Sequence, residues 1–189
     1  MSELPDIFVE ATGRTRTNYS LPLLAGAARL ARQAQAIEQA NAGAEFGAFF
    51  DELLQCVPPA IMLSVSALES YTNELAADRH MHWGKRHEAG LLDAIWDDER
   101  RDRPIDKVVR AYQCSGQAFD RGSSPWQDVD DLVALRNKIV HFRPEWSDEK
   151  AEHDRLSRRL QTRFPGSPFL PDSERLFPRR FASHACAEW

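Results

Sequence analysis

The spacing of apolar residues constrains this chain most, because in several separate stretches it follows the period of an α-helix. The clearest stripe runs at intervals of three and four residues through Ile61, Val65, Leu68, Thr72 and Leu75. Such spacing places side chains on one face of a helix that packs against a core. No stretch shows the alternation of polar and apolar residues that is typical of a half-buried β-strand. An all-α protein is therefore expected.

Helix and breaker signals divide the chain into three parts. Residues 1–20 are polar and irregular, and no regular element is expected there. Residues 21–142 hold the predicted helical core, and residues 143–189 add a helix and a short final helix as an extension of the same domain. A chain of 189 residues suits one domain, which we expect to contain about five to seven helices.

Two breaks are predicted inside the helical core. The helix expected across residues 45–79 contains Pro58 and Pro59, which should cause a kink or a short break because proline lacks an amide proton. The polar, glycine-containing string RHMHWGKRHEAG, residues 79–90, predicts a loop. The last core helix should begin at Ser124, a plausible N-cap that precedes a proline.

Composition excludes several classes of protein. A formal charge of -5 argues against a protein that coats nucleic acid nonspecifically, since that requires many Lys and Arg contacts to phosphate. Charges or prolines interrupt the apolar runs, so no membrane span is expected, and no secretory signal is evident at the N-terminus. The three cysteines lack CxxC spacing and are expected to be free thiols. A cytoplasmic protein is predicted.

The last core helix carries the strongest functional signal. Arg136 falls near the middle of its predicted apolar arc, formed by Val129, Leu132, Val133, Leu135, Ile139, Val140 and Phe142. A guanidinium stays charged in a protein, so at this position it needs an acidic or phosphate partner, a cleft or an interface.

Asn137 and His141 lie four residues apart, on a common face beside that arc. Arg136 can reach toward the same end of the helix. An imidazole can take or give a proton near neutral pH, and an arginine can stabilise a phosphate as charge builds on it. These groups are sufficient to cleave an RNA phosphodiester through attack by the 2′-hydroxyl, without a metal.

The string ALRNKIVHFRPEW, residues 134–146, resembles the Arg-x4-6-His motif of the HEPN superfamily, and SALESYTNELA, residues 66–76, is similar to the helix that precedes it in that family. The resemblance covers roughly residues 45–142. It implies a HEPN-like bundle with a four-helix core, homodimerisation through the motif helices and, in many members, ribonuclease activity. We therefore expect a metal-independent endoribonuclease without a cofactor. It would act on single-stranded RNA as a toxin (with a neutralising antitoxin partner) or as a defence effector.

Four further residues could support this site. Glu69 and Asn73 lie one turn apart on the earlier helix, and Glu69 is expected to face Arg136 and orient it. Lys138 and Arg143 are candidate phosphate contacts, although a solvated surface position explains them equally well. Arg136 also fits a structural ion pair with Glu69 that sets helix register.

Several alternatives stay open. His141 also fits a cation near a helix C-terminus, and the chain also fits a non-catalytic HEPN scaffold for dimerisation or nucleotide binding that serves a partner such as a nucleotidyltransferase. His80, His82 and His87 lack a recognised metal-ligand spacing, so no metal is expected. The string RLSRRLQTR, residues 155–163, is interpreted as a solvated helix because the preceding acids nearly balance its charge.

Overall fold

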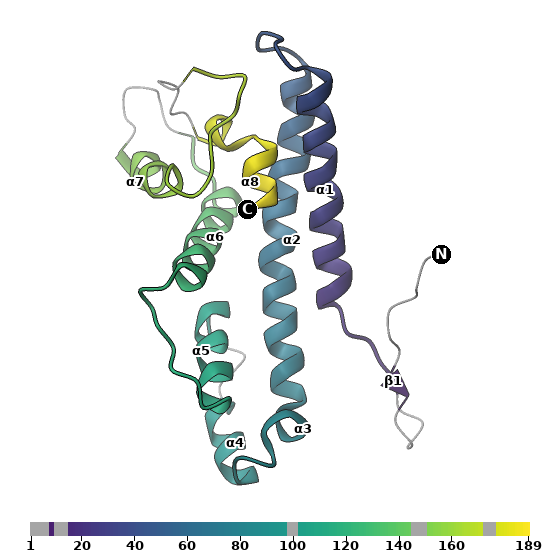
Figure 1. The fold of residues 1–189 in the computed structure, drawn as a ribbon, viewed down its shortest axis with the longest axis vertical. Coiled ribbons are helices and arrows are strands. Elements are labelled where there is room, and N and C mark those ends of the chain that lie inside the picture. Colours follow the sequence, from purple (N-terminus) through teal and green to yellow (C-terminus); the bar gives the residue numbers. More distant parts are fainter. Residues whose placement is uncertain (1–7, 10–14, 98–101, 145–150, 172–176) are drawn as a thin grey trace. The chain divides into compact units, whose positions relative to one another are not determined.

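The computed structural model describes residues 8–9, 15–97, 102–144, 151–171 and 177–189. The protein is mostly helical, which confirms the all-α class (Figure 1). Along these described residues the elements are β1 (Phe8–Val9), β2 (Thr15–Arg16), α1 (Ser20–Ala40), α2 (Phe49–Ala77), α3 (Arg79–Trp83), α4 (Ala89–Ile95), α5 (Pro104–Cys114), α6 (Ser124–Val140), α7 (Ala151–Leu160), the 3-10 helix η1 (Arg179–Phe181) and α8 (His184–Glu188).

The chain forms two compact units, and each is assembled from two separate stretches of sequence. Unit 1 consists of Met1–Leu23 and Val65–Gln127, and unit 2 of Leu24–Ser64 and Asp128–Trp189. The boundaries fall inside α1, α2 and α6, so each of these helices contributes to both units.

The core of unit 2 joins α2, α6, α7 and the C-terminal segment. Phe50, Leu53, Leu135 and Leu160 are fully buried in it. Each such side chain contributes roughly 1.5–3 kcal/mol relative to an exposed position. The parts of α1 and α2 in this unit lie side by side (Figure 1), and Ala34 of α1 is buried in the same core. Packing in this core holds α6 and α7, the two helices that carry the candidate site, in place.

The C-terminal segment is tied into unit 2 by specific hydrogen bonds. The amide of His184 donates to the Glu38 carboxylate over 2.6 Å, and the hydroxyl of Ser183 accepts from the amide of Cys186 as the N-cap of α8. The prediction of a short final helix is confirmed.

Unit 1 has a smaller core in which Trp83 and Trp96 stack, with their ring centroids 5.9 Å apart. The Glu74 carboxylate accepts from the amides of Tyr19 and Ser20 and from the Ser20 hydroxyl, which anchors the start of α1. Before it, β1 and β2 pair in an antiparallel register over two residues each. The expected absence of regular structure in residues 1–20 is therefore wrong for this pair.

One further local prediction is wrong, and another is decided in part. Residues 79–83 form the short helix α3 instead of a loop, because burial of Trp83 holds that turn against the core. A kink or a short break was expected at Pro58 and Pro59; helix α2 runs through both prolines, so the break is not found and the kink stays a prediction. The side chains beside the prolines, Val57 and Ile61, are buried, and their packing offsets the lost backbone hydrogen bonds. Short helices bring the described residues to eight α-helices, more than the five to seven expected.

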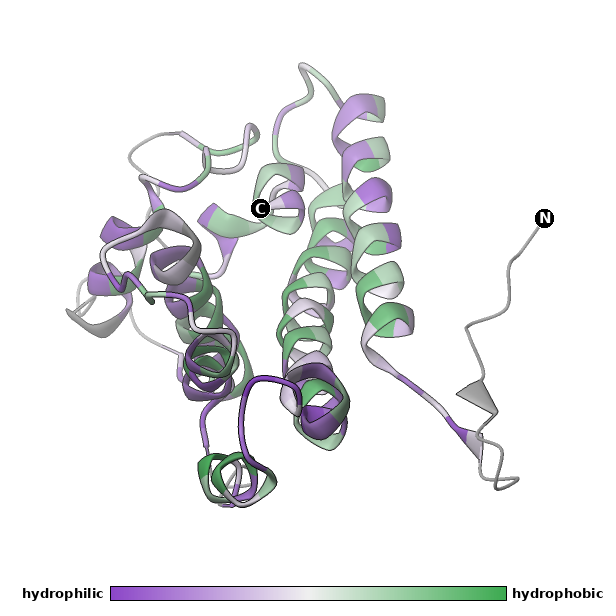
Figure 2. Ribbon diagram, turned by 60° about the horizontal axis from the view of Figure 1, so that its bottom comes forward, coloured by the Kyte–Doolittle hydropathy of each residue, from purple (hydrophilic) through white to green (hydrophobic). Residues whose placement is uncertain are grey.

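Helix α2 is long and apolar enough to cross a membrane when length and composition alone are considered. Its middle turns are coloured hydrophobic in Figure 2, and a third of its most apolar window is buried inside the protein. The core helix of a soluble protein meets the same test. The expectation of no membrane span therefore stays a prediction, because length and composition alone do not separate the two cases.

Candidate functional site

The motif residues lie at the C-terminal end of α6. Its hydrogen-bond ladder continues past Val140, because the amide of His141 donates to the carbonyl oxygen of Asn137 over 2.9 Å. Asn137 and His141 therefore project from one face, one turn apart, as their spacing predicts. Both residues are exposed.

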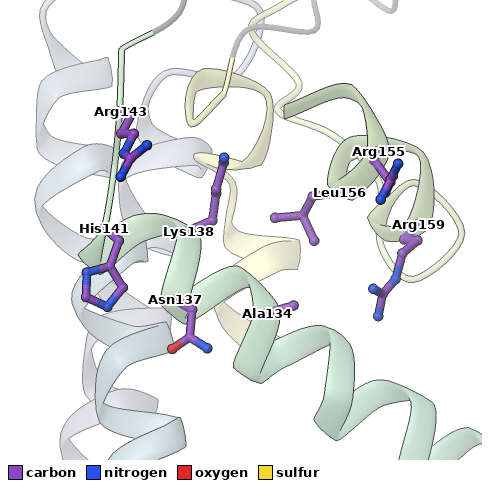
Figure 3. A pocket seen from close by; sticks show the side chains of 8 residues that line it. All are labelled: Ala134, Asn137, Lys138, His141, Arg143, Arg155, Leu156 and Arg159. Atoms are coloured by element: carbon purple, nitrogen blue, oxygen red, sulfur yellow. The ribbon is translucent and has the colours of Figure 1, made fainter. Parts of the chain in front are cut away.

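An open hollow of about 740 Å³ lies beside this face of α6. Figure 3 shows Lys138, Asn137 and His141 on α6 or just beyond its end, with Arg155 and Arg159 projecting from α7. Within the described chain the hollow is lined by Ala134, Asn137, Lys138, His141, Arg143, Arg155, Leu156 and Arg159. Its volume falls within the roughly 300–1,000 Å³ typical of ligand sites. The structure thus brings together four of the predicted residues: Asn137, His141, Lys138 and Arg143.

Arg136 does not line this hollow. It lies between Leu135, which is fully buried, and Asn137, which is exposed, and it is itself half-buried. Among the described residues of unit 2, its guanidinium has no hydrogen-bond or ion-pair partner. The predicted apolar arc is also divided, because Val140 and Phe142 are exposed while Leu135 faces the core. Within one chain, Arg136 and His141 therefore do not meet in this hollow.

Glu69 and Asn73 belong to unit 1, on α2. The side-chain oxygen of Asn73 accepts a hydrogen bond from Nζ of Lys107 over 2.7 Å. Lys107 is buried and was not singled out from the sequence, since a lysine on an amphipathic helix gives no such signal. The pairing of Glu69 with Arg136 would join the two units, and it stays a prediction.

Helix α7 supplies residues that line the hollow and were not predicted from the sequence to do so. Its apolar positions Leu156 and Leu160 are buried in the core of unit 2, whereas Arg155, Arg158 and Arg159 are exposed. Arg158 lies 3.9 Å from Asp154 in the expected intrahelical pair. Arg155 and Arg159 are exposed, as a solvated helix requires, and they also line the hollow.

Ion pairs between α7 and α6 hold this wall of the hollow in place. Arg159 pairs with Asp130, over 3.0 Å, and with Asp131. Arg163 pairs with Asp128 and Asp131, each over 2.9 Å. The Asp131 side chain is 4% exposed and accepts from both arginines. Partial burial opposes the charge on Arg159, yet its bonds to Asp131 and Asp130 raise the pKa of the guanidinium.

Some other basic side chains of the hollow lack a partner among the described residues. His141, Arg143 and Arg155 have no hydrogen-bond or ion-pair partner for their side chains within the described part of the chain. Arginine cannot lose its proton, so Arg143 and Arg155 give the hollow a fixed positive potential. An anionic ligand with several acceptor oxygens fits such a surface.

The histidines of residues 79–90 make other contacts. Nε2 of His80 lies 3.0 Å from the Asp93 carboxylate, and Nε2 of His87 lies 2.7 Å from the carbonyl oxygen of Cys114. Among the residues that the structure describes, no three His, Cys, Asp or Glu side chains form a metal-binding group. Cys56, Cys114 and Cys186 are free thiols, as predicted.

Comparisons with known proteins add little. No family model and no solved structure matches the chain. One similar curated protein is the DNA-directed RNA polymerase subunit beta' of Nephroselmis olivacea, 27% identical over 125 residues. The alignment covers 58% of this chain and 13% of that protein, so the chain spans about an eighth of the relative's length. This similarity assigns neither a family nor an activity.

Proposed function

We propose that this protein is a HEPN-type, metal-independent endoribonuclease that binds single-stranded RNA in the hollow between α6 and α7. One observation carries the proposal: the exposed imidazole of His141 and the exposed amide of Asn137 share an open hollow with Arg143 and Arg155, which have no ion-pair partner among the described residues. An RNA strand offers what this surface lacks, namely phosphate oxygens for the cations and a 2′-hydroxyl for the imidazole.

The proposed chemistry is an internal transfer of the phosphodiester. The 2′-oxygen attacks phosphorus as its proton passes to a base, the bond from phosphorus to the 5′-oxygen breaks, and a proton is returned to that oxygen. His141 serves as base or acid, and Asn137 orients the phosphate or the imidazole. The products are a 2′,3′-cyclic phosphate and a 5′-hydroxyl.

Arg136 stabilises the charge that builds on the phosphate in this proposal. Because it lies outside the hollow of its own chain, the proposal includes a homodimer in which two copies of the motif form one cleft. Glu69 would orient Arg136 there. Action in the cytoplasm as a toxin with a neutralising partner, or as a defence effector, belongs to the same proposal.

The test is cleavage of a labelled single-stranded RNA in excess chelator by the wild type, His141→Ala and Arg136→Ala. The control is Arg158→Ala, which removes an exposed charge outside the hollow. We expect the wild type and the control to cut, and the other two variants to fail while keeping their circular dichroism spectra. Equal cutting by His141→Ala and the wild type refutes the mechanism.

The second candidate is a non-catalytic HEPN scaffold that binds a nucleotide or a partner such as a nucleotidyltransferase. One observation favours it: within its own chain Arg136 does not line the hollow that holds His141. A wild-type protein that binds RNA but cuts none supports this candidate.

A further inference from the structure

The wall of the hollow that α7 forms carries an inference beyond the motif itself. Leu156, Ser157 and Leu160 are buried on one face of α7, whereas Arg155, Arg158 and Arg159 are exposed. Arg155 precedes Leu156 directly and lines the hollow from α7, across from Asn137 and His141 (Figure 3). Its guanidinium is thereby placed on the opposite side of the hollow from the imidazole.

The three exposed arginines of α7 differ in their partners. Arg158 pairs with Asp154 on its own helix, and Arg159 is held by Asp130 and Asp131. Arg155 has no carboxylate partner among the described residues. Within the described part of the chain, Arg155 is therefore the arginine of α7 that lines the hollow without a carboxylate partner.

The position of Arg155 is fixed by its neighbours. Arg159, one turn further along, is tied to α6 by its two carboxylate partners, and Arg163 repeats this bond a turn later. These pairs set the distance between α7 and α6. The backbone of Arg155 is thereby held in place before a ligand binds, so the cost of ordering on binding falls on its side chain.

We propose that Arg155 is a phosphate-binding residue of the RNA site. It binds a backbone phosphate next to the phosphate that lies at His141. This rests on the proposed function and names its substrate contact: a single strand whose successive phosphates meet first one wall and then the other. Arg143 and Lys138 add charge on the α6 side. Leu156 and Ala134 give an apolar floor that suits the less polar face of a ribose or base.

The experiment measures binding, so it does not depend on cleavage. The probe is a fluorescent oligouridine with 2′-fluoro sugars, which lacks the attacking hydroxyl and cannot be cut. Fluorescence anisotropy gives the dissociation constant for the wild type, Arg155→Ala and Arg158→Ala at several salt concentrations. Arg158→Ala is the matched control, because it removes the same charge from the same helix outside the hollow.

We expect Arg155→Ala to weaken binding about tenfold and to reduce the slope of log affinity against log salt by about 0.7, the value for one lost phosphate contact on a single strand. Arg155→Lys should recover part of the affinity, since it restores the charge without the bidentate geometry. Arg158→Ala should bind as the wild type does. Three outcomes overturn the proposal: both alanine variants weaken binding equally, Arg155→Ala does not weaken it, or the wild type does not bind. If the wild type binds through Arg155 but cuts no RNA, the nuclease fails and the phosphate contact stands.

Discussion

Asp131 is the residue whose removal should destabilise unit 2 most clearly through charge alone. It is a carboxylate on α6 with a side chain only 4% exposed, and it accepts from Arg159 and Arg163 on or just after α7. Asp131→Ala deletes the shared acceptor and leaves two guanidinium groups in its place. The neighbouring Asp130, with a side chain 49% exposed and one arginine partner, provides the matched control.

The size of the effect follows from the burial of the partners. Loss of one member of a fully buried ion pair costs about 3–5 kcal/mol, but the side chains of Arg159 and Arg163 are 46% and 20% exposed. Each arginine also keeps a second carboxylate, Asp130 or Asp128. We therefore expect Asp131→Ala to lower the free energy of unfolding by about 2 kcal/mol. Asp130→Ala should cost about 0–1 kcal/mol, as exposed pairs do.

Urea denaturation followed by circular dichroism measures both values, and thermal melting gives a second estimate. A loss of about 2 kcal/mol lowers the melting temperature of a chain of this size by about 4–8 °C. The argument from burial is refuted if Asp131→Ala is no more destabilising than Asp130→Ala.

Two further outcomes are expected. Leu135 is fully buried in the core of unit 2, so Leu135→Ala should lower the free energy of unfolding, measured by urea titration, by about 2–5 kcal/mol. Val140→Ala, on the same helix but at a position 46% exposed, should change it little. Equal losses for the two variants would contradict the placement of α6. Burial raises the pKa of the Cys186 thiol, so the thiol should stay protonated at pH 8 and react with a thiol reagent only after denaturant is added. Peptide mass spectrometry detects the labelling. If Cys186 is labelled in the native protein, this core is open to solvent and the prediction is wrong.

The regular part of the fold was predictable from local chemistry. The stripe of α2 and the Ser124 start of α6 depend on periodicity and capping residues within a few positions. Helix α3 was missed because its five residues owe their shape to the burial of Trp83, a contact with residues far along the chain. The same reason explains the uninterrupted α2, where packing around Pro58 outweighs the propensity of proline to break a helix.

Only the part of the site on α6 was predictable from the sequence. Asn137 and His141 are one turn apart on one helix, so spacing alone places them together. Arg155 comes from a different helix, and its unbalanced charge depends on which acids its neighbours bind. From the sequence, the arginines of α7 were expected to pair with acids that precede them on the same helix. In the structure, Arg159 instead pairs with acids of α6. A search for this pairing could have compared the acids within residues 128–131 with the arginines that recur every four residues at 155, 159 and 163.

The order of the two units along the chain has a consequence for folding. Unit 2 takes its first stretch from residues 24–64 and its second from residues 128–189, with most of unit 1 between them. Phe50 and Leu53 therefore stay without their apolar partners on α6 and α7 until synthesis has passed residue 160. Closing this core requires a long loop, which slows folding. The hollow between α6 and α7 consists wholly of residues from the later stretch, so it can form only after residue 159 has been synthesised.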